Sequence, residues 1–137
     1  MPPVFEWPVR VYYEDTDSGG VVYHSVYLNF MERARTEWLR SLGFDQSRLA
    51  RERGLVFAVS RLSVHFLAPA RMDDLLLITL TLAKRGGASL NLQQRIVHQS
   101  MHRPLIQAEV RIGLLDRAFK PVRLPNDLVE VLEKLDR

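Results

Sequence analysis

The segment Tyr13–Tyr27 reads YEDTDSGGVVYHSVY and joins two stretches with different hydrophobic patterns. Before it, apolar residues stand at every second position, which predicts a half-buried strand over Phe5–Tyr13. After it, apolar residues recur every three or four positions from Tyr27 to Leu42, which predicts one buried face of a helix. The segment is therefore a strand-to-helix junction that carries carboxylates, glycines and a histidine.

The rest of the chain predicts a sheet that follows this helix. A short second helix is expected over Ser47–Arg53 and should end at Gly54. The period then changes to two, and four strands are expected, over Val56–Leu67, Leu76–Leu82, Leu90–Ile96 and Ile106–Leu114. Hairpin turns are expected at Lys84–Gly87 and Ser100–Arg103, and a terminal helix after Pro125. One long helix against one antiparallel sheet is an α+β plan.

Length and composition indicate an ordinary globular protein. The chain has 137 residues, 47% hydrophobic and 26% charged, which suits a single domain over residues 1–137. It has no cysteine, which excludes disulfides, thiolate nucleophiles and cysteine zinc sites. No signal-peptide pattern and no apolar run long enough to span a bilayer is present, so we expect a cytoplasmic protein without a transmembrane segment.

The expected partners follow from charge and from the sheet. The net charge is +3, and arginines are dense at Arg48, Arg51, Arg53 and Arg61. No aromatic platform accompanies them, so we expect a solvated face and no nucleic-acid partner. A sheet with one covered face and free edges usually needs a second copy, so a homodimer is expected.

Neither acidic nor histidine spacing predicts a metal site. Asp15, Asp17 and Gly19 resemble the start of a calcium loop, but the twelfth position is Val26 where a glutamate is required. His98 and His102 are four residues apart beside a predicted hairpin turn, where we expect exposed loop histidines. The motifs of serine hydrolases and of nucleotide-binding loops are absent.

Two interpretations of the junction remain open from the residues alone. In the structural one, Asp17 shapes a turn and the glycines supply positive φ angles. In the functional one, Gly19–Gly20 lets a ligand approach the backbone, and the N–H groups of Val22–Ser25 lack intrahelical acceptors at the positive end of a helix. The Asp17 carboxylate would then be a base or nucleophile opposite an oxyanion hole.

A family resemblance favours the functional interpretation. The stretches VRVYYEDTDSGGVVYHSVYL (9–28) and MERARTEWLR (31–40) resemble the hotdog-fold acyl-CoA thioesterases. The similarity is to the 4-hydroxybenzoyl-CoA thioesterase superfamily, in its Tol-Pal-associated (YbgC-type) branch, and APARMDD (68–74) and QRIV (94–97) fit as well. The resemblance implies a curved antiparallel sheet wrapped around one long helix. It also implies dimers, often paired into tetramers, with active sites at the dimer interface.

The resemblance also implies roles for individual residues. Asp17 matches the catalytic aspartate, and His24 matches a histidine at the helix start whose N–H is the oxyanion donor. Supporting or substrate-positioning roles are expected for Tyr13, Thr16, Gly20, Val22, Tyr23 and Tyr27. Charge and loop placement alone suggest Arg61, Lys84 and Arg85 as ligands of the CoA phosphates.

The expected reaction is hydrolysis of an acyl-CoA thioester, in which CoA is part of the substrate and no cofactor or metal is needed. Acyl-carrier protein is a possible second substrate carrier, and peripheral association with a membrane fits the basic charge. Two alternatives stay open: a hotdog hydratase or dehydratase, and a non-catalytic module that binds acyl groups or acyl-carrier protein.

Overall fold

The computed structural model describes residues 3–135 as one sheet, three α-helices and one short 3₁₀ helix. The elements in chain order are β1 (Phe5–Arg10), the 3₁₀ helix (Tyr13–Asp15), α1 (Val26–Ser41), α2 (Gln46–Arg53), β2 (Val56–Phe66), β3 (Leu75–Arg85), β4 (Ser89–His98), β5 (Pro104–Leu115) and α3 (Asn126–Lys134). None of the helices in the described range has both the length and the apolar composition needed to cross a membrane.

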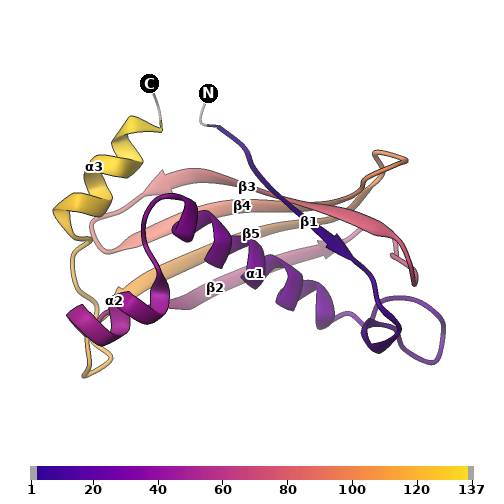
Figure 1. Cartoon of the computed structure of the whole chain (residues 1–137), viewed down its shortest axis with the longest axis horizontal. Coiled ribbons are helices and arrows are strands. Elements are labelled where there is room, and N and C mark those ends of the chain that lie inside the picture. The colour runs from indigo at the N-terminus through magenta and orange to yellow at the C-terminus, as the bar shows by residue number, and fades with distance from the viewer. Residues whose placement is uncertain (1–2, 136–137) are drawn as a thin grey trace.

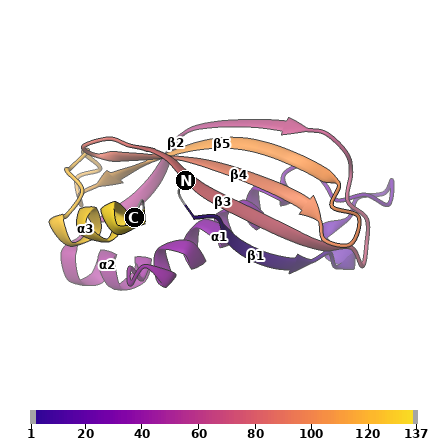
Figure 2. The ribbon, with the colours of Figure 1, turned by 90° about the horizontal axis from the view of Figure 1, so that it is seen from above.

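The five strands form one antiparallel sheet in the order β1-β3-β4-β5-β2. Figure 1 shows α1 running along the sheet, and Figure 2 shows the strands curving over it from the other side. The α2 and α3 helices lie together at the end of the molecule away from the junction loop. The α+β hotdog architecture expected from the sequence is therefore confirmed.

The core lies between α1 and the concave face of the sheet. Four members of the predicted stripe (Tyr27, Met31, Ala34 and Trp38) are buried together with Phe30 and Leu39, whereas Leu42 lies just past the helix and is half-buried. Alternate residues of β3, β4 and β5 are buried opposite them, as the period of two predicts. Each such large apolar side chain contributes about 1.5–3 kcal/mol when it leaves water. This packing fixes α1, and hence the junction loop at its N-terminal end, against the sheet.

The structure differs from the sequence-based boundaries at the end of β1 and at the β3–β4 turn. β1 ends at Arg10 and the side chain of Tyr13 is 81% exposed, so the prediction of a strand up to Tyr13 was wrong. Two bonds end the strand here. The Val11 N–H donates to the distant Asp74 carbonyl at 2.9 Å, and Asp15 Oδ2 accepts a hydrogen bond of 2.8 Å from the Tyr12 N–H where the chain enters the 3₁₀ helix. The β3–β4 turn is also shorter than predicted, since Lys84 and Arg85 still belong to β3.

Candidate active site

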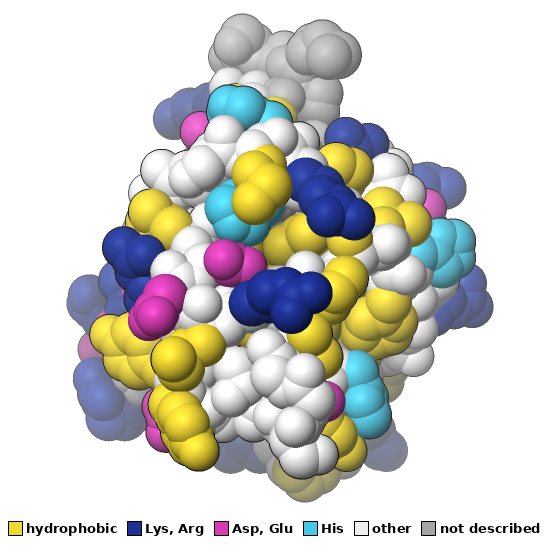
Figure 3. Space-filling model, turned by 90° about the vertical axis from the view of Figure 1, so that its right-hand side faces the viewer, with side chains coloured by type: hydrophobic (Ala, Val, Ile, Leu, Met, Phe, Trp, Pro, Cys, Tyr) yellow, Lys and Arg dark blue, Asp and Glu magenta, His cyan; other side chains and the backbone are white. Residues whose placement is uncertain are grey.

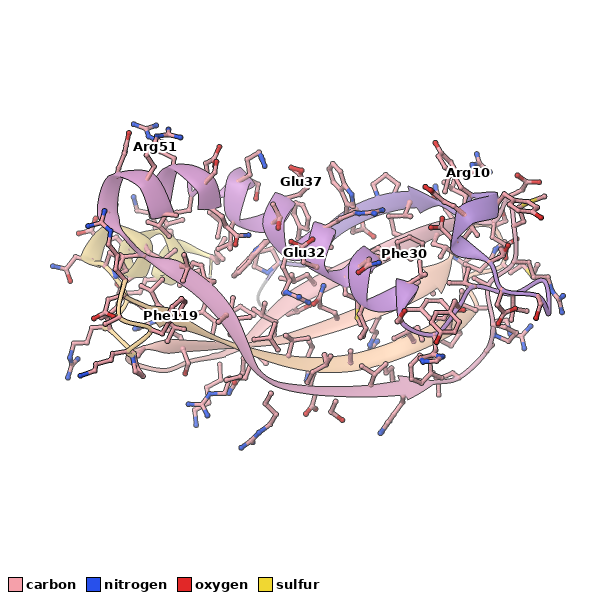
Figure 4. All side chains as sticks on the ribbon, turned by 90° about the horizontal axis from the view of Figure 1, so that it is seen from below. Arg10, Phe30, Glu32, Glu37, Arg51 and Phe119 are labelled. Atoms are coloured by element: carbon pink, nitrogen blue, oxygen red, sulfur yellow. The ribbon has the colours of Figure 1, made fainter. Side chains whose placement is uncertain are left out.

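The junction folds back on itself as a narrow loop just before α1. Thr16 and Val22 form an isolated antiparallel bridge, and the Asp17 N–H donates to the Val21 carbonyl at 2.9 Å. Gly20 turns the chain with a φ of +80°, a conformation that glycine adopts without steric cost. The loop lies at the end of the molecule near Arg10, opposite the end that carries Phe119 (Figure 4).

Asp17 stands exposed at the start of this turn. Its Oδ1 accepts a hydrogen bond of 2.8 Å from the Gly19 N–H, and within residues 3–135 its Oδ2 receives none. The carboxylate borders a surface hollow lined by Tyr13, Thr16, Ser18, Gly20 and Met72. One oxygen is therefore held by the turn while the other accepts no hydrogen bond within residues 3–135, an arrangement compatible with both interpretations of Asp17.

The free backbone donors before α1 are fewer than the sequence predicted. As predicted, the Val22 and Tyr23 N–H groups have no intrahelical acceptor, but they are not free: Val22 donates to the Ala70 carbonyl at 2.9 Å and Tyr23 to the Asp15 carbonyl at 3.0 Å. α1 begins at Val26, and the N–H groups of His24 and Ser25 have no acceptor within residues 3–135. These two donors at the positive end of the helix are suited to an oxyanion.

Tyr23 and Tyr27, the two tyrosines nearest to His24 in the sequence, differ in their exposure to solvent. The rings of Tyr23 and His24 are both exposed and lie with their centroids 4.3 Å apart. Tyr27 is buried, and its hydroxyl oxygen accepts a hydrogen bond of 2.9 Å from the Ala70 N–H. Burial raises the pKa of Tyr27, the bond from Ala70 partly offsets this, and the negative charges of Asp74 and Asp17 raise it further.

The comparisons with known proteins agree with this geometry. A family model described as the thioesterase superfamily matches residues 19–104. The chain belongs to this family. The acyl-CoA thioesterase YbgC of Haemophilus influenzae is 43% identical over 125 residues, which cover 90% of both chains. The acyl-CoA thioester hydrolase YbgC of Escherichia coli O157:H7 is 48% identical over 127 residues, which cover 92% of this chain and 93% of the relative.

A solved structure extends the similarity to three dimensions. A probable thioesterase from Bartonella henselae superimposes with a TM-score of 0.84 at 39% identity, covering 90% of this chain and 100% of the other. The matched span includes Gly20 and His24, and the family model begins just after Asp17.

The structure separates the residues suggested for the CoA phosphates. Arg61 and Lys84 line one hollow of about 520 Å³, together with Arg111, which points outward from β5. Arg85 lies elsewhere, and its guanidinium is 3.5 Å from Glu133 Oε1 of α3. Within the single chain, neither Arg61 nor Lys84 lines the hollow beside Asp17.

Two residues that contact or border this candidate site were missed by the sequence analysis. Met72 lines the hollow beside Asp17, and Ala70 bonds to both Val22 and Tyr27. Both belong to the APARMDD segment, whose similarity to the family was the available signal. Figure 3 faces this end of the molecule and shows basic, acidic and histidine side chains interspersed with hydrophobic ones.

Replacing Tyr27 with Phe should lower stability by about 1–3 kcal/mol, because the buried Ala70 N–H then loses its acceptor. Urea unfolding of the variant and the wild type measures the difference. The ring remains, so its edge contact with Phe66, with centroids 6.0 Å apart, is kept. Equal midpoints and slopes for the two proteins would show that the Ala70 N–H is satisfied in another way.

Proposed function

We propose that the chain hydrolyses acyl-CoA thioesters to the free acid and CoA. The observation that carries the proposal is that one short loop holds both the exposed Asp17 carboxylate and the His24 N–H, which has no acceptor within residues 3–135. The N–H of His24 stabilises the negative charge that develops on the thioester oxygen. Asp17 attacks the carbonyl carbon or removes a proton from the attacking water.

The leaving group explains why so few residues suffice. A thiol has a pKa of about 8.5, so CoA departs as a thiolate without a strong general acid. The imidazole of His24, which is exposed, would assist the departing sulfur or orient water. Tyr13, Thr16 and Gly20 border the hollow in which the thioester carbon would lie. The proposal requires neither a metal nor a cofactor.

We extend the proposal to the CoA part of the substrate, to the carrier of the acyl group and to the location of the protein. Arg61 and Lys84 carry the charge that suits CoA phosphates, and Arg111 belongs with them, whereas the contact of Arg85 with Glu133 makes it a weaker candidate. An acyl group carried by an acidic carrier protein, or presented at a membrane surface, is compatible with the net charge of +3. We also propose a cytoplasmic location, where acyl-CoA is present.

We infer that the active unit is a homodimer joined along β2, and a tetramer would be a pair of such dimers. β2 is an edge strand whose outer backbone groups have no partner strand in residues 3–135. Its residues Val59, Leu62 and Phe66 lie opposite buried residues of β5, and thus on the concave face, yet they are 47%, 41% and 54% exposed. An apolar row of this kind beside a free edge needs a cover, which a second copy provides.

Thiol release from a panel of acyl-CoAs, from short aliphatic to long-chain and aromatic, tests the proposal. Turnover of at least one member is expected, and its order across the panel defines the preferred acyl group. A crotonyl-type thioester distinguishes the hydratase alternative, because a hydratase consumes the alkene without releasing thiol. Tight acyl-CoA binding with no turnover of CoA or carrier-protein esters would identify a binding module instead.

A further inference from the structure

The turn Ala70–Asp74 lies against the junction loop that carries Asp17 and His24, and it contacts this loop through backbone hydrogen bonds. The Ala70 carbonyl accepts the Val22 N–H at 2.9 Å, and Arg71 forms an antiparallel bridge with Val21. Met72, the next residue, borders the hollow beside Asp17. The position of the loop relative to the core therefore depends on the shape of this turn.

The carboxylate of Asp74 fixes the shape of the turn. Its Oδ2 accepts a hydrogen bond of 2.8 Å from the Arg71 N–H, and its own N–H donates to the Arg71 carbonyl at 3.1 Å. Asp73 between them has a φ of +72°, a conformation that a non-glycine residue keeps only when its surroundings hold it. Arg10 adds a bond of 2.7 Å from Nη1 to the Asp73 carbonyl.

His98 holds the other oxygen of this carboxylate. Its Nε2 is 3.3 Å from Asp74 Oδ1, and the two side chains are only 12% and 24% exposed. The position of His98 at the end of β4 corrects the expectation of an exposed loop histidine. Its Nδ1 accepts a bond of 3.3 Å from the Met101 N–H, so the neutral ring carries its proton on Nε2, the nitrogen that lies beside Asp74.

Both ring nitrogens of His98 are thus engaged within the fold, which leaves no lone pair for proton transfer to a substrate. We propose that Asp74 and His98 form a positioning pair that holds Asp17 in register with the His24 N–H through the turn Ala70–Asp74. This role rests on the proposed thioester hydrolysis. A displacement of about 1 Å at a catalytic group can cost up to about 10²-fold in rate, so loss of the pair should reach the chemistry without any contact to substrate.

Three variants test the pair with the acyl-CoA that the wild type hydrolyses fastest. His98→Leu removes the bond from Met101 and the contact with Asp74, His98→Gln keeps an amide donor near the place of Nε2, and His102→Asn alters an exposed histidine in the same turn. We expect His98→Leu to lower kcat about 10–10²-fold with little change in KM, His98→Gln to recover most of kcat, and His102→Asn to match the wild type. Loss of kcat with KM preserved separates misplacement of Asp17 from weaker substrate binding.

Hydrogen exchange of the Val22 amide gives a readout that does not need activity. Because this amide donates to Ala70, we expect it to exchange faster in His98→Leu than in the wild type and to be protected again in His98→Gln. Normal kcat in His98→Leu, equal loss in both His98 variants, or unchanged Val22 exchange would each overturn the positioning pair. Absence of thiol release from the wild type would refute the proposed function, and the exchange data would still decide whether the pair holds the loop.

Asp74→Asn provides a second variant should His98→Leu fail to fold. It keeps the volume of Asp74 but has one oxygen where the structure uses two, so either Arg71 or His98 loses its acceptor. We expect the same pattern of lowered kcat and faster Val22 exchange. A wild-type kcat in Asp74→Asn would equally overturn the role of the pair.

Discussion

Asp17→Asn should lower the rate of thioester hydrolysis by about 10²–10⁴-fold while the protein stays folded. The amide cannot remove a proton or attack the carbonyl, so the chemical step is lost whether Asp17 is base or nucleophile. Its oxygen can still accept the Gly19 N–H that Oδ1 now accepts at 2.8 Å, so the turn keeps its shape. Steady-state thiol release, with the melting temperature measured on the same samples, gives the result.

Asp15→Asn is the matched control for this experiment. Asp15 lies in the same loop, and its Oδ2 accepts the Tyr12 N–H at 2.8 Å, a bond that an amide oxygen also makes. The variant removes the same charge from the same loop without touching the hollow beside Asp17. We expect activity close to the wild type. Equal activities of Asp17→Asn, Asp15→Asn and the wild type would exclude Asp17 from the mechanism.

The elements of this fold are predictable because their signals are local. The helical stripe from Tyr27 and the alternation in β5 each record one buried face, and the structure confirms both. Gly54 ends α2 in the left-handed conformation, as predicted. The end of β1 was not predictable in this way, since the Val11 N–H bonds to Asp74, a residue 63 positions further along the chain.

The residues of the candidate site also fall into those with a local sequence signal and those without one. Asp17 and His24 could be proposed from the sequence because a short motif holds both, and the geometry leaves the N–H groups of His24 and Ser25 as the candidate oxyanion donors. The bonds of Ala70 to Val22 and Tyr27, and the contact of His98 with Asp74, join segments that only the folded sheet brings together. No hydrophobic period or short motif encodes such pairings, so they had to come from the structure.

Leu62→Lys should dissociate the proposed homodimer. Leu62 lies opposite Val110, which is 1% exposed, so it points to the concave face while its own side chain is 41% exposed. Covering Leu62 contributes about 1.5–3 kcal/mol, and an unpaired lysine in the same place adds the cost of desolvating a charge. The dissociation constant should rise at least about 10²-fold, which sedimentation velocity over a concentration series measures.

Ser63→Lys is the matched control, because Ser63 is the next residue of β2 and faces the opposite side, across from Glu109. It adds the same charge to the same strand outside the concave face, so the dimer should persist. If the active site needs both subunits, thiol release by Leu62→Lys falls in proportion to the fraction of monomer and returns at high protein concentration, whereas Ser63→Lys shows no such dependence. A Leu62→Lys protein that stays dimeric would move the interface away from β2, and a fully active monomer would place the whole catalytic site within one chain.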